Sequence, residues 1–118
     1  MKRVFFTLIC IYCFTFYANC QEQKPPSDTI RVVFENQKLI VTEFVSTSGK
    51  DVCGRGKHTH SPHLAVFLTD AKARLLSDDG SAKDFDLKAG TTLWSEAETH
   101  MVVNNGGRAV KVYLIELK

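Results

Sequence analysis

Cysteine is scarce in this sequence outside its first twenty residues. Cys10, Cys13 and Cys20 lie at the start of the chain, and Cys53 is the one cysteine that follows them. A single cysteine cannot build a disulfide framework, which excludes the small disulfide-stapled class of exported proteins. The chain after residue 20 must therefore be stabilised by a hydrophobic core, and about 98 residues suffice for one small domain.

The sequence also lacks helical periodicity and an excess of charge of one sign. No window repeats its apolar residues with the 3.6-residue period of an amphipathic helix. The full chain has 15 Lys and Arg against 13 Asp and Glu, and two of the basic residues, Lys2 and Arg3, belong to the extreme N-terminus. A neutral domain without a basic stripe binds nucleic acid poorly, because such binding depends on neutralising phosphates. We expect no nucleic-acid partner.

One long hydrophobic run is present, and it lies near the N-terminus. A short basic head, residues 1–3, precedes the almost wholly apolar residues 4–17, and Ala18-Asn19-Cys20 leads into polar sequence. This order is typical of a secretory signal peptide, and the run is short for a spanning helix, which needs about 20 apolar residues. We predict a signal peptide over residues 1–20 and an exported protein, either periplasmic, secreted or anchored to a membrane by lipid.

Two processing routes fit the end of this signal. Cleavage after small residues would use Ala18 and Cys20 and leave Gln21 first, whereas a lipoprotein-type signal would leave Cys20 first and carrying lipid. The residues before Cys20 resemble a bacterial lipobox loosely, so both routes stay open. Residues 21–29 are polar, contain Pro25-Pro26 and are predicted to form a linker.

From residue 30 onward the chain is a series of short β-like runs separated by turn signals. Asp78-Asp79-Gly80 predicts a hairpin with a type I′ turn, since Asp-Gly suits the positive φ angles of that turn. The final run, residues 109–117, is expected to be buried on at least one face. Many short strands at close spacing predict an all-β single domain, a sandwich or barrel. The expected strands span residues 30–35, 38–46, 64–68, 71–76, 83–87, 91–94 and 109–117.

All four histidines of the chain occur in two short segments outside these runs, residues 58–63 and 97–104. His58, His60 and His63 lie close together, and His100 follows about forty residues later. Residues i and i+2 of a strand face the same side, so His58 and His60 are expected to project together. A break at Ser61-Pro62 would turn His63 back to that side, because proline interrupts a strand ladder. We expect His100 to arrive from a strand packed across the barrel.

Neutral imidazole is the commonest metal ligand among side chains, and this pattern predicts a metal site. Imidazole is accepted by Fe, Mn, Zn, Ni and Cu, so the ligands do not select one divalent transition metal. Three or four protein nitrogens with a vacant position would give a catalytic type of site. The alternative is that some of these residues are ordinary core or surface histidines. No nucleophile triad or paired-carboxylate pattern identifies a catalytic residue.

These segments resemble the two motifs of the small single-domain cupins, of the cupin-2 conserved-barrel type. The pair His58 and His60 matches the His-x-His of the first motif, with His63 in the place of its glutamate. Gly90 matches the opening of the second motif, and His100 with Asn104 matches its closing His-x3-Asn, although Glu96 and Glu98 replace its proline and glycine and the spacing is one residue short. The resemblance covers residues 30–118.

The resemblance implies a cupin-type jelly-roll β-barrel with His58, His60, His63 and His100 as metal ligands. The exchange of glutamate for His63 would give a neutral all-nitrogen shell, which favours a different metal or reactivity. Cupins of this size often are dioxygenases, isomerases or lyases acting on a small organic molecule, and commonly pair as homodimers. The alternative is a barrel that binds a metal or small ligand without catalysis, or a metal-free dimerisation barrel.

Four further features have less specific interpretations. Cys53 is near enough in sequence to approach the site, although a free thiol is more often an inert small residue. Gly54-Arg55-Gly56 is interpreted as a flexible turn because no helix follows it to form an anion site. We expect Trp94 to pack in the core, the alternative being that it lines the cavity. We expect Glu96 and Glu98 to be solvated in a loop, the alternative being an acid or base role near the metal.

Overall fold

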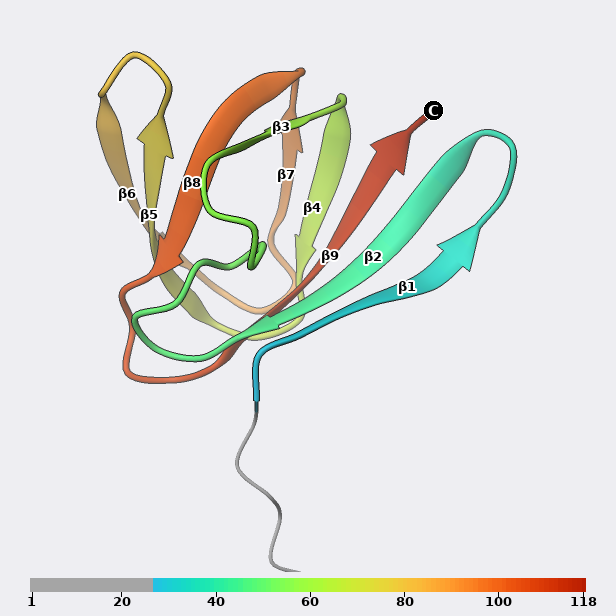
Figure 1. Ribbon diagram of the computed structural model, residues 1–118. Coiled ribbons are helices and arrows are strands. Elements are labelled where there is room, and N and C mark those ends of the chain that lie inside the picture. The colour runs from blue at the N-terminus through green and yellow to red at the C-terminus, as the bar shows by residue number, and fades with distance from the viewer. Residues whose placement is uncertain (1–26) are drawn as a thin grey trace, which may run out of the picture.

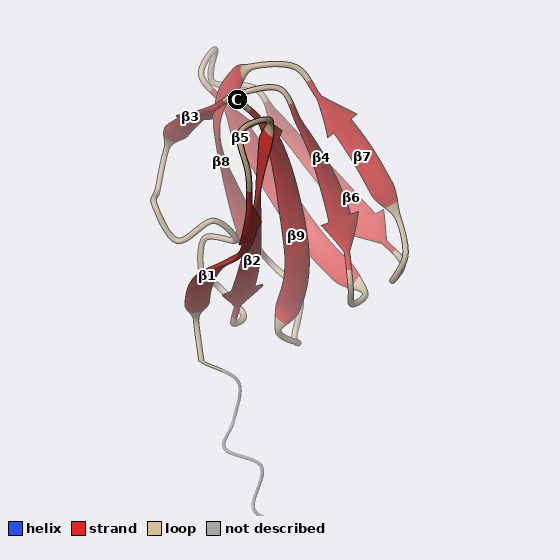
Figure 2. Ribbon diagram, turned by 90° about the vertical axis from the view of Figure 1, so that its right-hand side faces the viewer, coloured by secondary structure: helices blue, strands red, loops and turns tan. Residues whose placement is uncertain are grey.

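The computed structural model describes residues 27–118, which form nine antiparallel β-strands in two facing sheets (Figures 1 and 2). One sheet has the order β1-β2-β9-β4-β7 and the other β3-β8-β5-β6. The predicted all-β barrel is confirmed. No helix within residues 27–118 has the length and apolar character needed to cross a membrane. The strands are β1 (Thr29–Glu35), β2 (Leu39–Ser46), β3 (His58–His60), β4 (His63–Phe67), β5 (Ala71–Ser77), β6 (Ala82–Leu87), β7 (Thr92–Ser95), β8 (Glu98–Asn104) and β9 (Val110–Leu117).

The predicted signal peptide, residues 1–20, and its Cys20 lie outside the described residues, as does most of the linker predicted over residues 21–29. The first strand begins at Thr29, one residue before the predicted start of the domain.

Buried and partly exposed side chains alternate along β9, and the buried ones form the centre of the core. Val110, Val112 and Leu114 are each at most 5% exposed and face the interior between the sheets. Phe44 on β2, 2% exposed, is paired in register with Val112 and packs into the same cluster. Period-two burial is what a strand with one face on a core requires, and it confirms the expected burial of the last run.

The same alternation brings polar residues to one end of the barrel. Two residues beyond Leu114, Glu116 is directly opposite His63 in the β4–β9 ladder. His63 is in turn opposite Ser95 of β7. In the other sheet, His58 pairs with His100, and His60 with Glu98. The interior is thus apolar in the middle and carries histidines and carboxylates at this end.

The break at Ser61-Pro62 moves the chain from one sheet to the other. β3 ends at His60 in the four-stranded sheet, and β4 begins at His63 in the five-stranded sheet. His63 therefore faces the other two histidines of its segment from the opposite wall. The expectation for His100 was wrong in its geometry: β8 is the direct neighbour of β3, so His100 lies beside His58, and it is His63 that lies across the barrel.

The hairpin between β5 and β6 forms where it was predicted, but its turn type differs. Gly80 has a φ of 84°, while none of the described non-glycine residues, Asp79 included, has a positive φ. Type I′ requires positive φ at both central residues. The amide of Gly80 donates to the carbonyl of Ser77, and the Ser77 amide to the carbonyl of Ser81. This is a three-residue loop in which a type I turn is followed by a left-handed glycine.

Asn104, at the end of β8, is completely buried, and its side chain links β8 to the end of β2 and to the loop before β9 by hydrogen bonds. Its carboxamide donates to the backbone carbonyls of Ser46 and Arg108, and its oxygen accepts the amide of Gly106. A buried amide with three partners is satisfied, so this residue positions the end of β8 rather than contributing a free polar group.

Candidate metal centre

The four histidine rings gather at the polar end of the barrel from three strands. The ring of His60 lies at the centre, with centroids 4.3 Å from His58, 4.8 Å from His63 and 5.2 Å from His100. The ring of His100 lies 6.1 Å from that of His58 and 6.3 Å from that of His63. His60, His63 and His100 are each at most 4% exposed. Four imidazoles packed this closely and this deeply are a candidate metal centre rather than scattered surface residues.

Hydrogen bonds to oxygen acceptors orient three of the rings. His58 Nδ1 is 2.7 Å from the carbonyl of Gly56, and His63 Nδ1 is 2.9 Å from the carbonyl of Ser61. His60 Nδ1 is 2.9 Å from the Oε1 atom of Glu116. Because a carbonyl or carboxylate oxygen only accepts, each Nδ1 must donate its proton. In a neutral ring this leaves Nε2 as a free lone pair, the arrangement that metal-binding histidines usually show.

Two of these lone pairs face each other. His58 Nε2 and His60 Nε2 are 2.7 Å apart. Burial lowers the pKa of His60, opposed by the hydrogen bond that the ring donates to Glu116, so a neutral ring is favoured there. Two unprotonated nitrogens at this distance repel unless a cation lies between them. Ligands bound about 2.1 Å from one ion at right angles would be about 3.0 Å apart, so small ring movements suffice to accept a metal.

His100 differs from the other three rings. Its Nδ1 is 3.0 Å from the Oε1 atom of Glu98, but the alignment is too poor for a hydrogen bond, and this buried nitrogen has no hydrogen-bond partner within residues 27–118. Burial lowers the pKa of His100, and the neighbouring Glu98 carboxylate opposes that shift. Ser95 Oγ donates to the same carboxylate oxygen. An unsatisfied buried nitrogen costs free energy, which a bound cation or ligand would recover.

Cys53 joins the cluster from the loop of residues 47–57, whose middle is held by Asp51. Its Sγ lies 3.6 Å from His60 Nε2. Burial, with a smaller contribution from the Asp51 charge, raises the pKa of the thiol to about 12. The donor atoms of Cys53, His58 and His60 all lie within 4.8 Å of one another. These three side chains offer a metal ion one donor atom each, and His63 and His100 lie outside this group of three.

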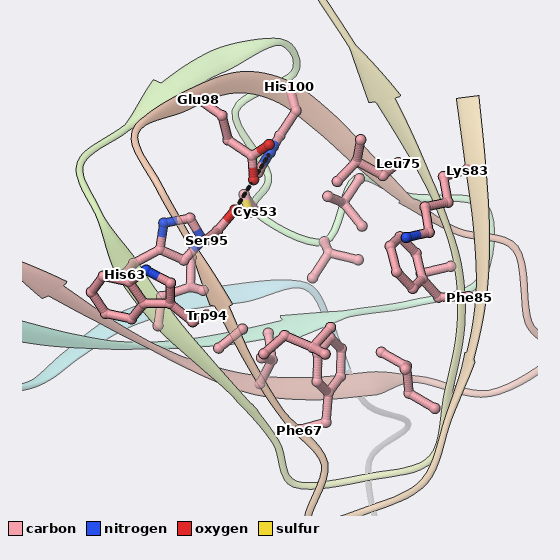
Figure 3. Close-up of a pocket in the computed structure, with 18 residues that line it drawn as sticks. Cys53, His63, Phe67, Leu75, Lys83, Phe85, Trp94, Ser95, Glu98 and His100 are labelled. Atoms are coloured by element: carbon pink, nitrogen blue, oxygen red, sulfur yellow. Dashed lines mark hydrogen bonds and ion pairs between the residues drawn. The ribbon is translucent and has the colours of Figure 1, made fainter. Parts of the chain in front are cut away.

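A cavity of about 270 Å³ opens beside the cluster (Figure 3). Cys53, His63, Ser95, Glu98 and His100 form its polar end. The rest of its wall is mainly apolar, and Lys83 lies on the far side with its ammonium 5.0 Å from the centre of the Phe85 ring. The remaining lining residues are Val52, Ala65, Phe67, Ala73, Leu75, Leu87, Leu93, Trp94, Val102, Val112 and Leu114. A small organic molecule in this cavity would contact His63 and His100 directly.

The structure corrects two secondary expectations. Trp94 is 53% exposed and lies at the cavity wall instead of in the core. Glu98 is not in a loop: it begins β8 and lines the cavity, whereas Glu96 is exposed and accepts the indole N–H of Trp94. The glycine-rich turn forms as expected. The backbone amides of this loop donate to the carboxylate of Asp51, a side chain of the same loop.

Glu116 is the functional candidate that the sequence analysis missed. A signal was available, because residues 112, 114 and 116 share one face of a strand, and a carboxylate on a core-facing position is unusual. Its partner His60 could not have been inferred, since the contact depends on the chain changing sheets at Ser61-Pro62.

No family model and no curated protein matches the chain. Several solved structures are similar to it. A cupin domain from Bordetella pertussis Tohama I superimposes with a TM-score of 0.68 at 26% identity, covering 80% of this chain and 97% of that one. The chain folds as a cupin. An RmlC-like cupin with a double-stranded β-helix fold from Methanocaldococcus jannaschii gives a TM-score of 0.65 at 10% identity, covering 81% and 84% of the two chains. A cupin 2 conserved-barrel protein from Salinispora arenicola gives 0.56 at 20% identity, covering 75% and 73%.

The cupin fold agrees with the resemblance seen in the sequence and supports a barrel that binds a small ligand or a metal. The histidines of this cupin meet at one end of the barrel, where β3, β4 and β8 bring them together. The chemistry of the donors fits a transition metal: three nitrogens freed by their hydrogen bonds, one buried unsatisfied nitrogen and an adjacent thiol.

Proposed function

We propose that this chain is an exported metal-binding cupin that acts as a small metal-dependent enzyme on a small organic molecule. The observation that carries the proposal is that a cluster of four histidines, three of them buried, lies beside an apolar cavity. His58, His60, His63 and His100 would hold one divalent transition metal, Fe, Mn, Zn, Ni or Cu. When bound there, the metal would supply Lewis-acid or oxygen chemistry, of the dioxygenase, isomerase or lyase type.

The chain's own residues define what such a ligand must look like. The apolar wall excludes water and favours a molecule with an apolar body. The ammonium of Lys83 on the far wall favours an acidic group at the end away from the histidines. At the polar end, Glu98 is positioned by Ser95 and can accept a proton from the ligand.

An enzyme and a non-catalytic binding protein can be distinguished by testing whether solvent reaches the bound metal ion. For the Mn²⁺- or Cu²⁺-loaded protein we expect enhanced water-proton relaxation, because an open position admits exchangeable water. The enhancement should fall when a small carboxylic acid enters the cavity. A tightly bound ion that leaves water relaxation at the level of a closed, fully coordinated complex would contradict the enzymatic proposal and favour the non-catalytic binding barrel.

A homodimer through the edge strand β1 is a second proposal, supported by a separate observation. All seven residues of β1 are exposed, and its apolar side chains Ile30, Val32 and Phe34 are about half exposed, at 47%, 51% and 52%. β1 is also the outer strand of its sheet, projecting with β2 from the barrel (Figure 1). Natural edge strands are normally protected, so an apolar edge suits pairing with a second copy.

We expect sedimentation at micromolar concentration to give twice the mass of the chain, and a Phe34→Lys variant to sediment as a monomer. Leu68→Lys, at an exposed apolar residue outside β1, is the matched control and should remain a dimer. A monomeric wild-type protein would rule this interface out.

A further inference from the structure

The loop that carries Cys53 is built around one carboxylate. Asp51 Oδ1 accepts the amide of Cys53 at 3.2 Å, and Oδ2 accepts the amides of Arg55 and Gly56 at 2.8 and 2.6 Å. The carbonyl of Gly56 then accepts the Nδ1 proton of His58. Val52, next to Cys53, donates its amide to Val102 of β8 and joins the core. The same turn therefore fixes both the thiol and the orientation of His58.

The thiol is directed at the histidine cluster. Cys53 is 3% exposed, lines the polar end of the cavity, and has its sulfur 3.6 Å from the Nε2 atom of His60. That nitrogen has no proton of its own in a neutral ring, since Nδ1 donates to Glu116. A second buried group with an unsatisfied nitrogen, His100, has its ring 5.2 Å from that of His60. The donor atoms of Cys53, His58 and His60 converge within 4.8 Å of one another, beside the His100 ring.

We propose that Cys53 is a further metal ligand, so that the centre has a mixed sulfur and nitrogen shell in which Cys53, His58 and His60 form one face. The inference rests on the metal site proposed above. As the metal–sulfur bond forms, the S–H bond breaks and its proton passes to solvent. The resulting thiolate supplies the single negative ligand charge that four neutral imidazoles lack. A soft sulfur donor favours Zn, Cu or Fe over Mn.

Cobalt(II) reconstitution of the full-length chain tests this, because thiolate–cobalt bonds absorb in the near ultraviolet through charge transfer, while imidazole–cobalt bonds do not. We expect the wild-type protein to show this band at one cobalt per chain. Cys53→Ser should lose the band and bind cobalt at least about tenfold more weakly, the lower end of what loss of even an outer-shell partner costs. Lys57→Ala, at an exposed residue of the same loop, is the control and should retain the band.

The outcomes separate the two proposals. Cobalt bound by the wild-type protein with visible absorption but without the charge-transfer band would overturn the role of Cys53 and leave the histidine site standing. Failure to bind cobalt at all would overturn both. Circular dichroism of Cys53→Ser, and of Cys53→Ala as a second variant, shows whether the strand content is kept. A band that persists in the folded variants would also contradict the proposal.

Discussion

Replacing His60 by alanine is expected to lower the affinity for divalent metal by more than about 100-fold, since loss of an outer-shell partner alone costs about 10- to 100-fold. His60 is the ring closest to all the others and lies beside the thiol of Cys53. Its removal abolishes the 2.7 Å contact with His58 Nε2 and the 3.6 Å contact with Cys53 Sγ. The measurement is competitive titration of the protein against a chromophoric chelator of known affinity.

Two further variants make this prediction specific. Thr59→Ala changes the middle residue of the same three-residue strand, whose exposed hydroxyl is hydrogen-bonded to that of Thr99, and should leave the affinity unchanged. Glu116→Gln keeps an oxygen acceptor for His60 Nδ1 but removes its charge, and should lower the affinity about tenfold. A His60→Ala protein that stays folded and binds metal as tightly as wild type would contradict the site.

Replacing Phe44 by alanine is expected to lower the free energy of unfolding by about 3–5 kcal/mol, the range for removing a buried phenylalanine. Phe44 is among the largest fully buried side chains and packs against β9 in the central cluster. Since a small domain has a total stability of about 5–15 kcal/mol, this loss is a large part of the whole.

Urea unfolding followed by circular dichroism measures this effect. Leu68→Ala, at a residue that is 39% exposed, is the comparison and should change the stability by less than about 1 kcal/mol. A Phe44→Ala protein as stable as Leu68→Ala would mean that the core is not centred between β2 and β9. Phe44 is not part of the cavity wall, so the folded fraction of the variant should still bind metal.

Most of the fold could be predicted from local sequence because the strands are short, β-rich and separated by strong turn signals. The last run was expected to be buried on at least one face, and Val110, Val112 and Leu114 form that face. The predicted type of the turn between β5 and β6 was wrong because the same residues are compatible with two turn types. Asp79-Gly80 suits a type I′ turn, but a type I turn followed by a left-handed residue needs a positive φ only at Gly80.

The candidate site was less accessible to sequence reasoning, because its geometry depends on long-range pairing. Period two placed His58 and His60 on one face, and Pro62 gave the break before His63. Nothing local indicates that β8 pairs with β3, which sets His100 beside His58. Glu116 is 56 residues from His60 in the sequence and reaches it from the other sheet. Cys53 is 7 residues from His60 and reaches it from a loop.

The most direct test of the metal centre is elemental analysis of the wild-type chain, expressed and purified without a metal-binding tag. A mononuclear site predicts about one equivalent of a transition metal per chain, lost in His60→Ala. Iron would indicate oxygen activation, and zinc, manganese or nickel Lewis-acid chemistry or binding. No metal above trace, even after reconstitution with each candidate ion, would contradict the account and make the four histidines a packed polar cluster in a metal-free barrel.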